Sequence, residues 1–127
     1  MHRSEFLKLV KERLPELRSA LNRQEGQIHF EVEEPRKYAQ RAIFDGNREA
    51  LDICLRLAEE AYSEGDKELK NAIDVSFVEG LDFVTPHASH PSSHPWAWEM
   101  MPTALKRLYE DFHGVRGQPQ RSQRRDA

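Results

Sequence analysis

Three histidines occur at short spacing in a stretch rich in proline and serine. His87, His90 and His94 form the pattern H-x2-H-x3-H. Three neutral imidazoles around one ion suit zinc and leave a fourth position open for hydrolytic chemistry. The surrounding prolines place the histidines on a loop, which does not hold ligands rigidly. A metal-dependent hydrolase is therefore an alternative hypothesis, and a solvated polar loop is favoured.

Two carboxylates, Asp74 and Glu79, lie among apolar residues between Asn71 and Leu81. A buried carboxylate needs a hydrogen-bonding or charged partner. Two acids in a cleft with raised pKa values would suit acid–base catalysis. Because no motif for a nucleophile or an oxyanion donor accompanies them, we favour a structural role as caps or as partners of an arginine.

Two tryptophans, Trp96 and Trp98, are separated by one residue. On a helix they would point about 200° apart, so they do not easily enter the same pocket. One interpretation buries one ring and leaves the other as an exposed anchor of the kind found at binding hot spots. The other interpretation, which we favour, buries both.

Charge is distributed unevenly along the 127 residues. The net charge is -3, but residues 115–127 hold four arginines against Asp126, a net +3, so the remainder carries -6. An acidic body matches a basic protein better than a nucleic acid. The tail has no aromatic residue among its arginines, so nucleic-acid binding through it is a further, less favoured hypothesis.

Two similar stop signals punctuate the chain. They are Asp45-Gly46-Asn47 and Glu64-Gly65-Asp66, whose glycines are nineteen residues apart. Glycine adopts the positive φ that often ends a helix, and Asn or Asp accepts hydrogen bonds from the first N–H groups of the next one. This pattern predicts short antiparallel helices.

The first half of the chain is predicted to contain two helices before the first stop. One begins at a Ser4 cap and extends to Leu21 with a kink at Pro15, although a second short helix after Leu14 is the alternative. Residues 22–27 are expected to be a loop. Residues 28–32 alternate in hydropathy and are either extended or helical. Pro35 is expected as the first residue of the next helix.

Three further helices are predicted after the first stop. Residues 48–63 form an amphipathic helix with Cys54 on its apolar side and Glu59 and Glu60 on its polar side. Residues 67–81 are apolar on most sides, which is typical of a central helix. Pro102 is expected to start the last helix, which ends at Gly114 and has four residues on its inner face: Leu105, Leu108, Tyr109 and Phe112.

The fold class is therefore all-α. We expect one domain over residues 1–114, a compact bundle of four to six short antiparallel helices, with a helical-repeat arrangement as the alternative. A Pro/Ser/His loop interrupts it, and residues 115–127 form a disordered basic tail. No apolar run reaches membrane-spanning length and no secretory signal is visible, so a cytoplasmic location is expected. The single cysteine excludes an internal disulfide, and no cofactor is expected.

Two segments resemble a family of small bacterial helical proteins of unknown function. They are Ala72-Ile73-Asp74-Val75-Ser76-Phe77-Val78-Glu79 and Trp96-Ala97-Trp98-Glu99-Met100-Met101-Pro102. The resemblance covers about residues 34–112. Such families are often similar in size and acidity to immunity proteins that neutralise bacterial toxins, which implies a protein partner but assigns no site residues.

The leading hypothesis is a non-enzymatic protein-binding module, immunity-like or regulatory. It would act through acidic helical faces, with Glu59 and Glu60, and through the loop at residues 85–98, with Trp96 and Trp98. The expected partner is a protein with a basic surface, and neither a membrane nor a nucleic acid is expected. The sequence leaves the oligomeric state open.

Overall fold

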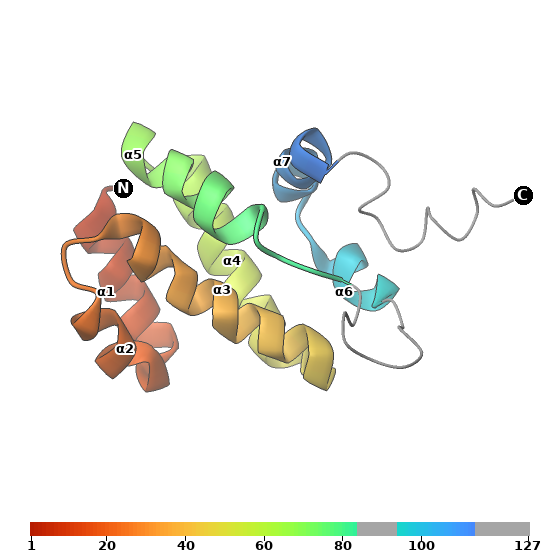
Figure 1. Ribbon diagram of the computed structural model, residues 1–127, viewed down its shortest axis with the longest axis horizontal. Helices are drawn as coiled ribbons and strands as arrows, with labels where there is room; N and C mark the ends of the chain where they lie inside the picture. The colour runs from red at the N-terminus through yellow and green to blue at the C-terminus, as the bar shows by residue number, and fades with distance from the viewer. Residues whose placement is uncertain (84–93, 114–127) are drawn as a thin grey trace, which may run out of the picture.

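The computed structural model describes residues 1–83 and 94–113. Within these ranges the chain is helical and contains no strand (Figure 1). The prediction of an all-α fold is confirmed. The predicted disordered tail at 115–127 and most of the predicted loop lie outside the described residues. The elements are α1 (Arg3–Arg13), the 3-10 helix η1 (Pro15–Leu17), α2 (Arg18–Arg23), α3 (Ile28–Asp45), α4 (Arg48–Glu64), α5 (Lys67–Ala72), the π-helix η2 (Ile73–Val78), α6 (Pro95–Met100) and α7 (Thr103–His113).

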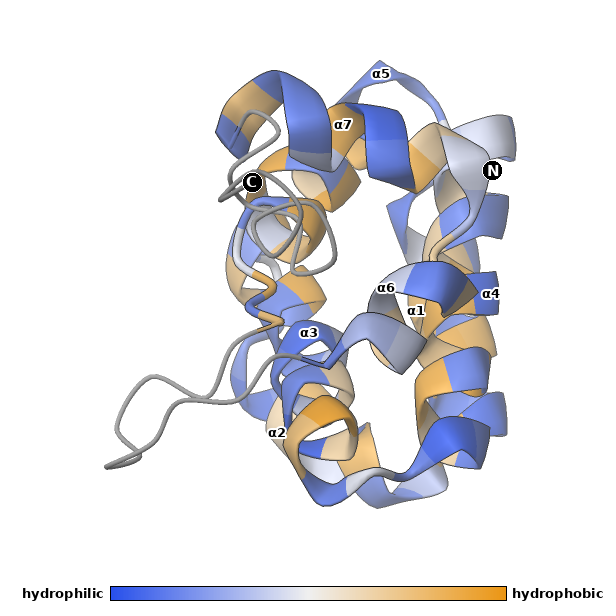
Figure 2. Ribbon diagram, turned by 90° about the vertical axis from the view of Figure 1, so that its right-hand side faces the viewer, coloured by the Kyte–Doolittle hydropathy of each residue, from blue (hydrophilic) through white to orange (hydrophobic). Residues whose placement is uncertain are grey.

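The antiparallel pair α3 and α4 forms the centre of the bundle. Gly46 adopts φ 73°, and the side chain of Asn47 accepts a hydrogen bond of 3.1 Å from the Ala50 N–H. The first stop is therefore built as predicted. Apolar and polar residues alternate along the helices (Figure 2), and the apolar ones from both helices are buried between them, including Ile43, Leu51 and Cys54.

The second stop also ends one helix and begins the next, but its glycine has a different backbone conformation. Asp66 caps α5 as predicted, since its Oδ1 accepts a hydrogen bond of 2.9 Å from the Leu69 N–H. Gly65, however, is extended, with φ -73° and ψ 157°, so the predicted positive φ is wrong. Glycine fits there because a Cβ would clash with the carbonyl oxygen of Ala61. Glycine is therefore needed at position 65 because the backbone of Ala61 lies close to it, and not because of a positive φ.

The first predicted helix is interrupted rather than kinked. Helix α1 ends at Arg13, and Pro15 opens η1, which leads into α2, so the alternative of a second short helix is confirmed. Proline lacks an N–H and its ring clashes with the carbonyl four residues earlier, which explains the break. Ser4 also lies inside α1 instead of capping it: His2 precedes the helix, and its N–H donates to Glu5 at 3.0 Å.

Helix α3 begins seven residues earlier than predicted. Residues 28–32 are helical, and Pro35 is a buried interior residue rather than the first one. The apparent alternation is misleading because Phe30 is 50% exposed. The buried positions Val32, Pro35, Ala39 and Ile43 follow helical spacing instead, so core packing outweighs the hydrogen bond that Pro35 cannot donate.

The predicted helix over 67–81 is divided into α5 and a π-helical segment. The Glu79 N–H donates to the Asp74 carbonyl at 3.1 Å, the i to i+5 pattern of a π-helix. Ile73, Phe77 and Val78 are buried. One side of this segment faces solvent, because the apolar side chain of Val75 is 44% exposed.

Helices α6 and α7 are joined to the bundle by an aromatic cluster. The rings of Phe83, Trp98 and Tyr109 meet edge to face with centroids 5.3–5.5 Å apart. Leu105 and Tyr109 face the core as predicted, but Phe112 is 59% exposed because the last turn of α7 extends beyond the cluster. In the described part of the chain, no helix is both long and apolar enough to cross a membrane.

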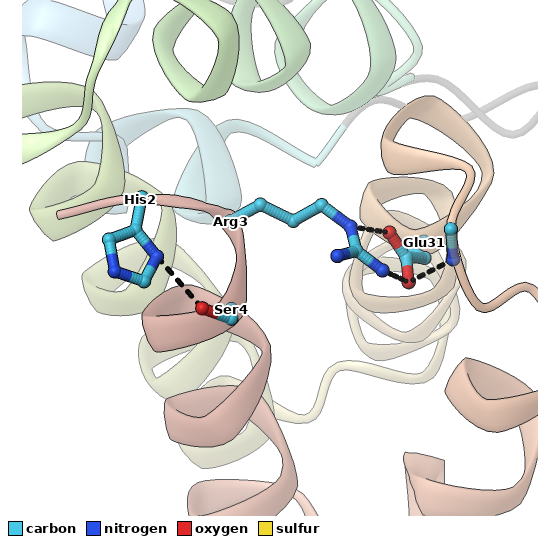
Figure 3. A network of polar contacts seen from close by, with 5 residues as sticks. His2, Arg3, Ser4 and Glu31 are labelled. Carbon is cyan, nitrogen blue, oxygen red and sulfur yellow. Dashed lines mark hydrogen bonds and ion pairs between the residues drawn. The ribbon is translucent and has the colours of Figure 1, made fainter.

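A buried ion pair connects the N-terminal ends of α1 and α3 (Figure 3). Glu31 is 1% exposed, and the Nε and Nη2 atoms of Arg3 each donate to one of its oxygens at 2.7 Å. The Gly26 N–H donates to the same carboxylate at 3.2 Å, from a turn residue with φ 88°. The hydrogen bond with Glu31 raises the pKa of Arg3. Three segments therefore meet at one carboxylate.

Replacing Arg3 should destabilise the protein strongly. Arg3→Met leaves a buried carboxylate with one backbone donor, and breaking a fully buried pair costs about 3–5 kcal/mol. Arg3 is 31% exposed, so we expect a smaller loss of about 2 kcal/mol in the free energy of unfolding, measured with urea. Arg18→Met, at an exposed position of α2, is the control. Equal stability of the two variants would contradict a structural role for the pair.

Candidate functional site

An acidic pocket lies at the C-terminal end of α4. Its volume is about 530 Å³. Helices α4, α5 and α7 contribute its walls, and it includes both glutamates that the sequence predicted as partner contacts. The lining residues are Glu59, Glu60, Tyr62, Ser63, Glu64, Lys70 and Ala104.

The amphipathic pattern of α4 places these side chains outside the core. Leu57, Ala58 and Ala61 are buried, so the intervening glutamates project from the opposite side. The helix ends at Glu64. The carbonyl of Glu64 accepts a hydrogen bond of 2.6 Å from the Met1 ammonium group, which offsets the partial negative charge of the helix end. The negative charge of the pocket therefore comes from its carboxylate side chains. The pocket therefore favours a cation.

The carboxylates of the pocket differ in their partners. Glu60 pairs with Arg13 of α1 at 2.6 Å, and both side chains are more than a third exposed. Among the described residues, Glu59 and the side chain of Glu64 have no hydrogen bond or ion pair. Two carboxylates are thus available to a guanidinium or ammonium group, and charge-assisted hydrogen bonds of this kind are strong. Lys70 supplies the opposing charge on the rim.

The two tryptophans have different surroundings. Trp98 is 2% exposed within the aromatic cluster. Trp96 is partly buried, and the guanidinium carbon of Arg48 lies 4.7 Å from its ring centroid. Arg48 begins α4, whereas Glu60 is twelve residues further along, about 18 Å at the helical rise. The structure therefore does not bring Trp96 and the acidic pocket together.

The histidine pattern is only partly described. His87 and His90 lie outside the described residues. His94 donates its backbone N–H to the Phe83 carbonyl at 2.8 Å, and its ring is 5.4 Å from that of Phe44. Within residues 1–83 and 94–113, no group of three His, Cys, Asp or Glu side chains is arranged to hold a metal ion.

Asp74 and Glu79 are half-buried, one inside η2 and the other just after it. Burial, and then the negative charge of Asp111 on α7, raises the pKa of Asp74. The carbonyl of Glu79 lies 2.9 Å from the ring of His113. These contacts place both residues at the junction of η2 and α7, away from the pocket residues of α4.

The sequence analysis missed the most buried carboxylate, Glu31. A signal was available, since Glu31 shares one helical stripe with Pro35, Ala39 and Ala42 at spacings of four, four and three. That stripe is visible only when residues 28–34 are assigned to a helix. Because residues 28–32 could be read as either extended or helical, the sequence did not reveal that the carboxylate of Glu31 is buried.

A serine–histidine contact also escaped the sequence analysis. His29 Nδ1 and Ser76 Oγ are 2.6 Å apart, within the range of a nucleophile and its base. Ser76 is only 8% exposed, and within the described residues no carboxylate bonds the imidazole. The contact therefore satisfies a buried hydroxyl group and lacks the third member that would orient the ring.

The described residues define a small all-helical protein in which an acidic pocket and a basic groove are each lined mainly by charged side chains. The chain belongs to the family described as Domain of unknown function (DUF7674), whose model matches residues 7–114. Comparisons with curated proteins and with solved structures gave no match. The predicted resemblance to a family of unknown function is confirmed, while the bacterial source and the likeness to immunity proteins stay predictions.

The two tryptophans should respond differently to a soluble quencher. In Trp98→Phe, the remaining Trp96 is partly exposed, so acrylamide should quench its fluorescence several-fold more than that of the buried Trp98 in Trp96→Phe. The two variants control for each other, with circular dichroism to verify folding. Equal quenching would show that Trp98 is not enclosed by Phe83 and Tyr109.

Asp74 should make stability depend on pH. A carboxyl whose pKa is raised by folding is stabilising while protonated, and that contribution is lost as pH rises through the folded-state pKa. Asp74→Asn should therefore unfold at a higher temperature than the parent at pH 7, and the difference should vanish in acid below the usual carboxyl range. Asp111→Asn should give a smaller rise, because burial is the larger cause. A less stable Asp74→Asn at pH 7 would refute this.

Proposed function

We propose that the protein is a non-enzymatic protein-binding module, immunity-like or regulatory, which receives a basic segment of its partner in the acidic pocket. One observation supports the proposal: among the described residues, the side-chain carboxylates of Glu59 and Glu64 have no hydrogen bond or ion pair, and both line the pocket at the C-terminal end of α4. Glu60 adds a third carboxylate that Arg13 holds in place.

The lining of the pocket favours a charged side chain over a metabolite. Pockets for small molecules have a similar volume, about 300–1,000 Å³, but are lined mainly by apolar and aromatic groups. Here Tyr62 is the only aromatic residue among the lining residues described, and three of the others are glutamates. Lysine or arginine from a partner fits this chemistry, and the ring of Tyr62 can contact the stem or the cationic head.

The acidic character of the protein supports the same proposal. Its net charge is -3, so its field accelerates encounter with a basic partner at low ionic strength. An immunity-like role would follow if that partner were a basic toxin encoded by a neighbouring gene. Trp96, which lies against Arg48 at the start of α4, would then form a second contact.

The experiment compares two double variants with the same change in charge. Glu59→Gln with Glu64→Gln neutralises the pocket, whereas Glu12→Gln with Glu99→Gln neutralises exposed positions outside it. Binding of a fluorescent lysine-rich peptide is measured by anisotropy over a range of salt concentrations. We expect the pocket variant to bind about tenfold more weakly, the control to bind like the parent, and affinity to fall with salt.

The same variants test the natural partner. Quantitative mass spectrometry of proteins captured from the source cell should show one basic protein recovered by the parent and the control but depleted with the pocket variant. If pocket and control variants bind the peptide equally, or if salt has no effect, the pocket is not the binding surface.

A further inference from the structure

Helix α3 lies beside η2 and the residues 79–83 that follow it (Figure 1), and one stripe of its side chains contacts them. His29 contacts Ser76, and further along α3 the side chain of Arg36 lies over Gly80. Gln40 then bonds the backbone of Asp82, and the ring of Phe44 meets that of His94. This stripe connects elements that are distant in sequence and fixes the side chains that make it.

A groove of about 370 Å³ runs along α3 beside this stripe. It is formed by two adjacent rows of the helix, at positions 36, 40 and 44 and at positions 37, 41 and 45. The residues that line it are Arg36, Lys37, Gln40, Arg41, Phe44 and Asp45.

The inner row is preorganised by its neighbours. A Cβ on Gly80 would lie 2.6 Å from Cδ of Arg36, so the glycine makes room for the arginine stem. The amide of Gln40 donates to the Asp82 carbonyl at 2.7 Å and accepts from its N–H at 2.8 Å. Phe44 is 37% exposed although one edge of the ring contacts His94. A ligand would therefore meet side chains that are already in position.

The groove is basic in an otherwise acidic protein. Within the described residues, neither Arg36 nor Arg41 has a carboxylate within ion-pair distance, and Lys37 approaches Glu34 only at 3.5 Å. Arginine presents a planar fork of donors that binds a carboxylate through two hydrogen bonds. Arg36 and Arg41 line the groove from its two adjacent rows, together with the exposed ring of Phe44, and this combination is complementary to acidic and apolar side chains together.

We propose that this groove binds a short acidic segment of another protein, with carboxylates on Arg36 and Arg41 and an apolar side chain on Phe44. This binding goes beyond the proposed function, because the groove has the opposite charge and a different position from the acidic pocket.

A short peptide fits better than a nucleic acid. Glu34 and Asp45 lie on the same helix on either side of the cationic positions, which span about 8 Å from residue 36 to residue 41. A phosphate backbone continues in both directions and would meet these carboxylates. The net charge of -3 also opposes a polyanion. Phe44 is the only aromatic residue among the lining residues described, whereas single strands favour successive stacking rings.

The test measures anisotropy of a fluorescent peptide that repeats Glu-Glu-Leu. Arg36→Gln with Arg41→Gln removes both guanidinium groups, and Arg18→Gln with Arg23→Gln makes the same change in charge at exposed positions of α2. We expect saturable binding by the parent and the control, and at least about tenfold weaker binding by the groove variant. Phe44→Ala should weaken binding with unchanged salt dependence, because it removes an apolar contact only. Circular dichroism confirms that each variant is folded.

Two further probes separate the outcomes. A matched peptide of Gln-Gln-Leu repeats should not bind, since it lacks carboxylates. A single-stranded oligonucleotide that binds more tightly than the acidic peptide, and loses affinity in the groove variant, would overturn the proposal in favour of a nucleic acid. Equal peptide binding by the groove and control variants, or no saturable binding by the parent, would also overturn it.

Discussion

The buried carboxylate of Glu31 is the constraint on which much of the bundle depends. Removing a carboxylate from water is costly, and the cost is offset only when its oxygens are fully bonded. Here both oxygens accept from Arg3, and the turn residue Gly26 contributes a third donor. The start of α1, the turn before α3 and the first turn of α3 must therefore come together before the charge is satisfied. Helix α3 in turn packs against α1, α2, α4, α5 and η2.

With α3 fixed, the central pair of helices separates opposite charges. The acidic pocket lies where α4 ends, and the basic groove runs along the second half of α3, which is followed at once by the start of α4. The two surfaces therefore belong to opposite ends of an antiparallel pair. A partner that carried both a basic and an acidic element would be oriented by this arrangement, since like charges would meet in the reversed orientation.

The polar groups that resemble catalytic ones have structural surroundings in the described part of the chain. The hydroxyl of Ser76 is buried and bonds His29, whose imidazole has no carboxylate partner among the described residues. Asp74 lies at the junction of η2 and α7 rather than in the pocket. Trp98 was predicted from the sequence as a candidate binding residue. It instead belongs to the aromatic cluster that joins α6 and α7 to the bundle. By contrast, charged side chains without ion-pair partners among the described residues gather in two surface pockets: Glu59 and Glu64 line one, and Arg36 and Arg41 line the other.

Sequence patterns were sufficient to predict the helical class, the first glycine stop, the caps at Asn47 and Asp66, and the outward face of α4 with Glu59 and Glu60. These features depend on neighbours within one or two turns, so local pattern is sufficient. Tertiary structure alone decided the helical state of residues 28–32, because the alternation of Ile28, Phe30 and Val32 is ambiguous until one side is buried. It also decided the division between Trp96 and Trp98, because the cluster with Phe83 and Tyr109 buries only the ring of Trp98. The basic groove was equally invisible in the sequence, because Arg36 lies against Gly80 and Gln40 bonds Asp82, about forty residues further along the chain, and only packing brings these residues together.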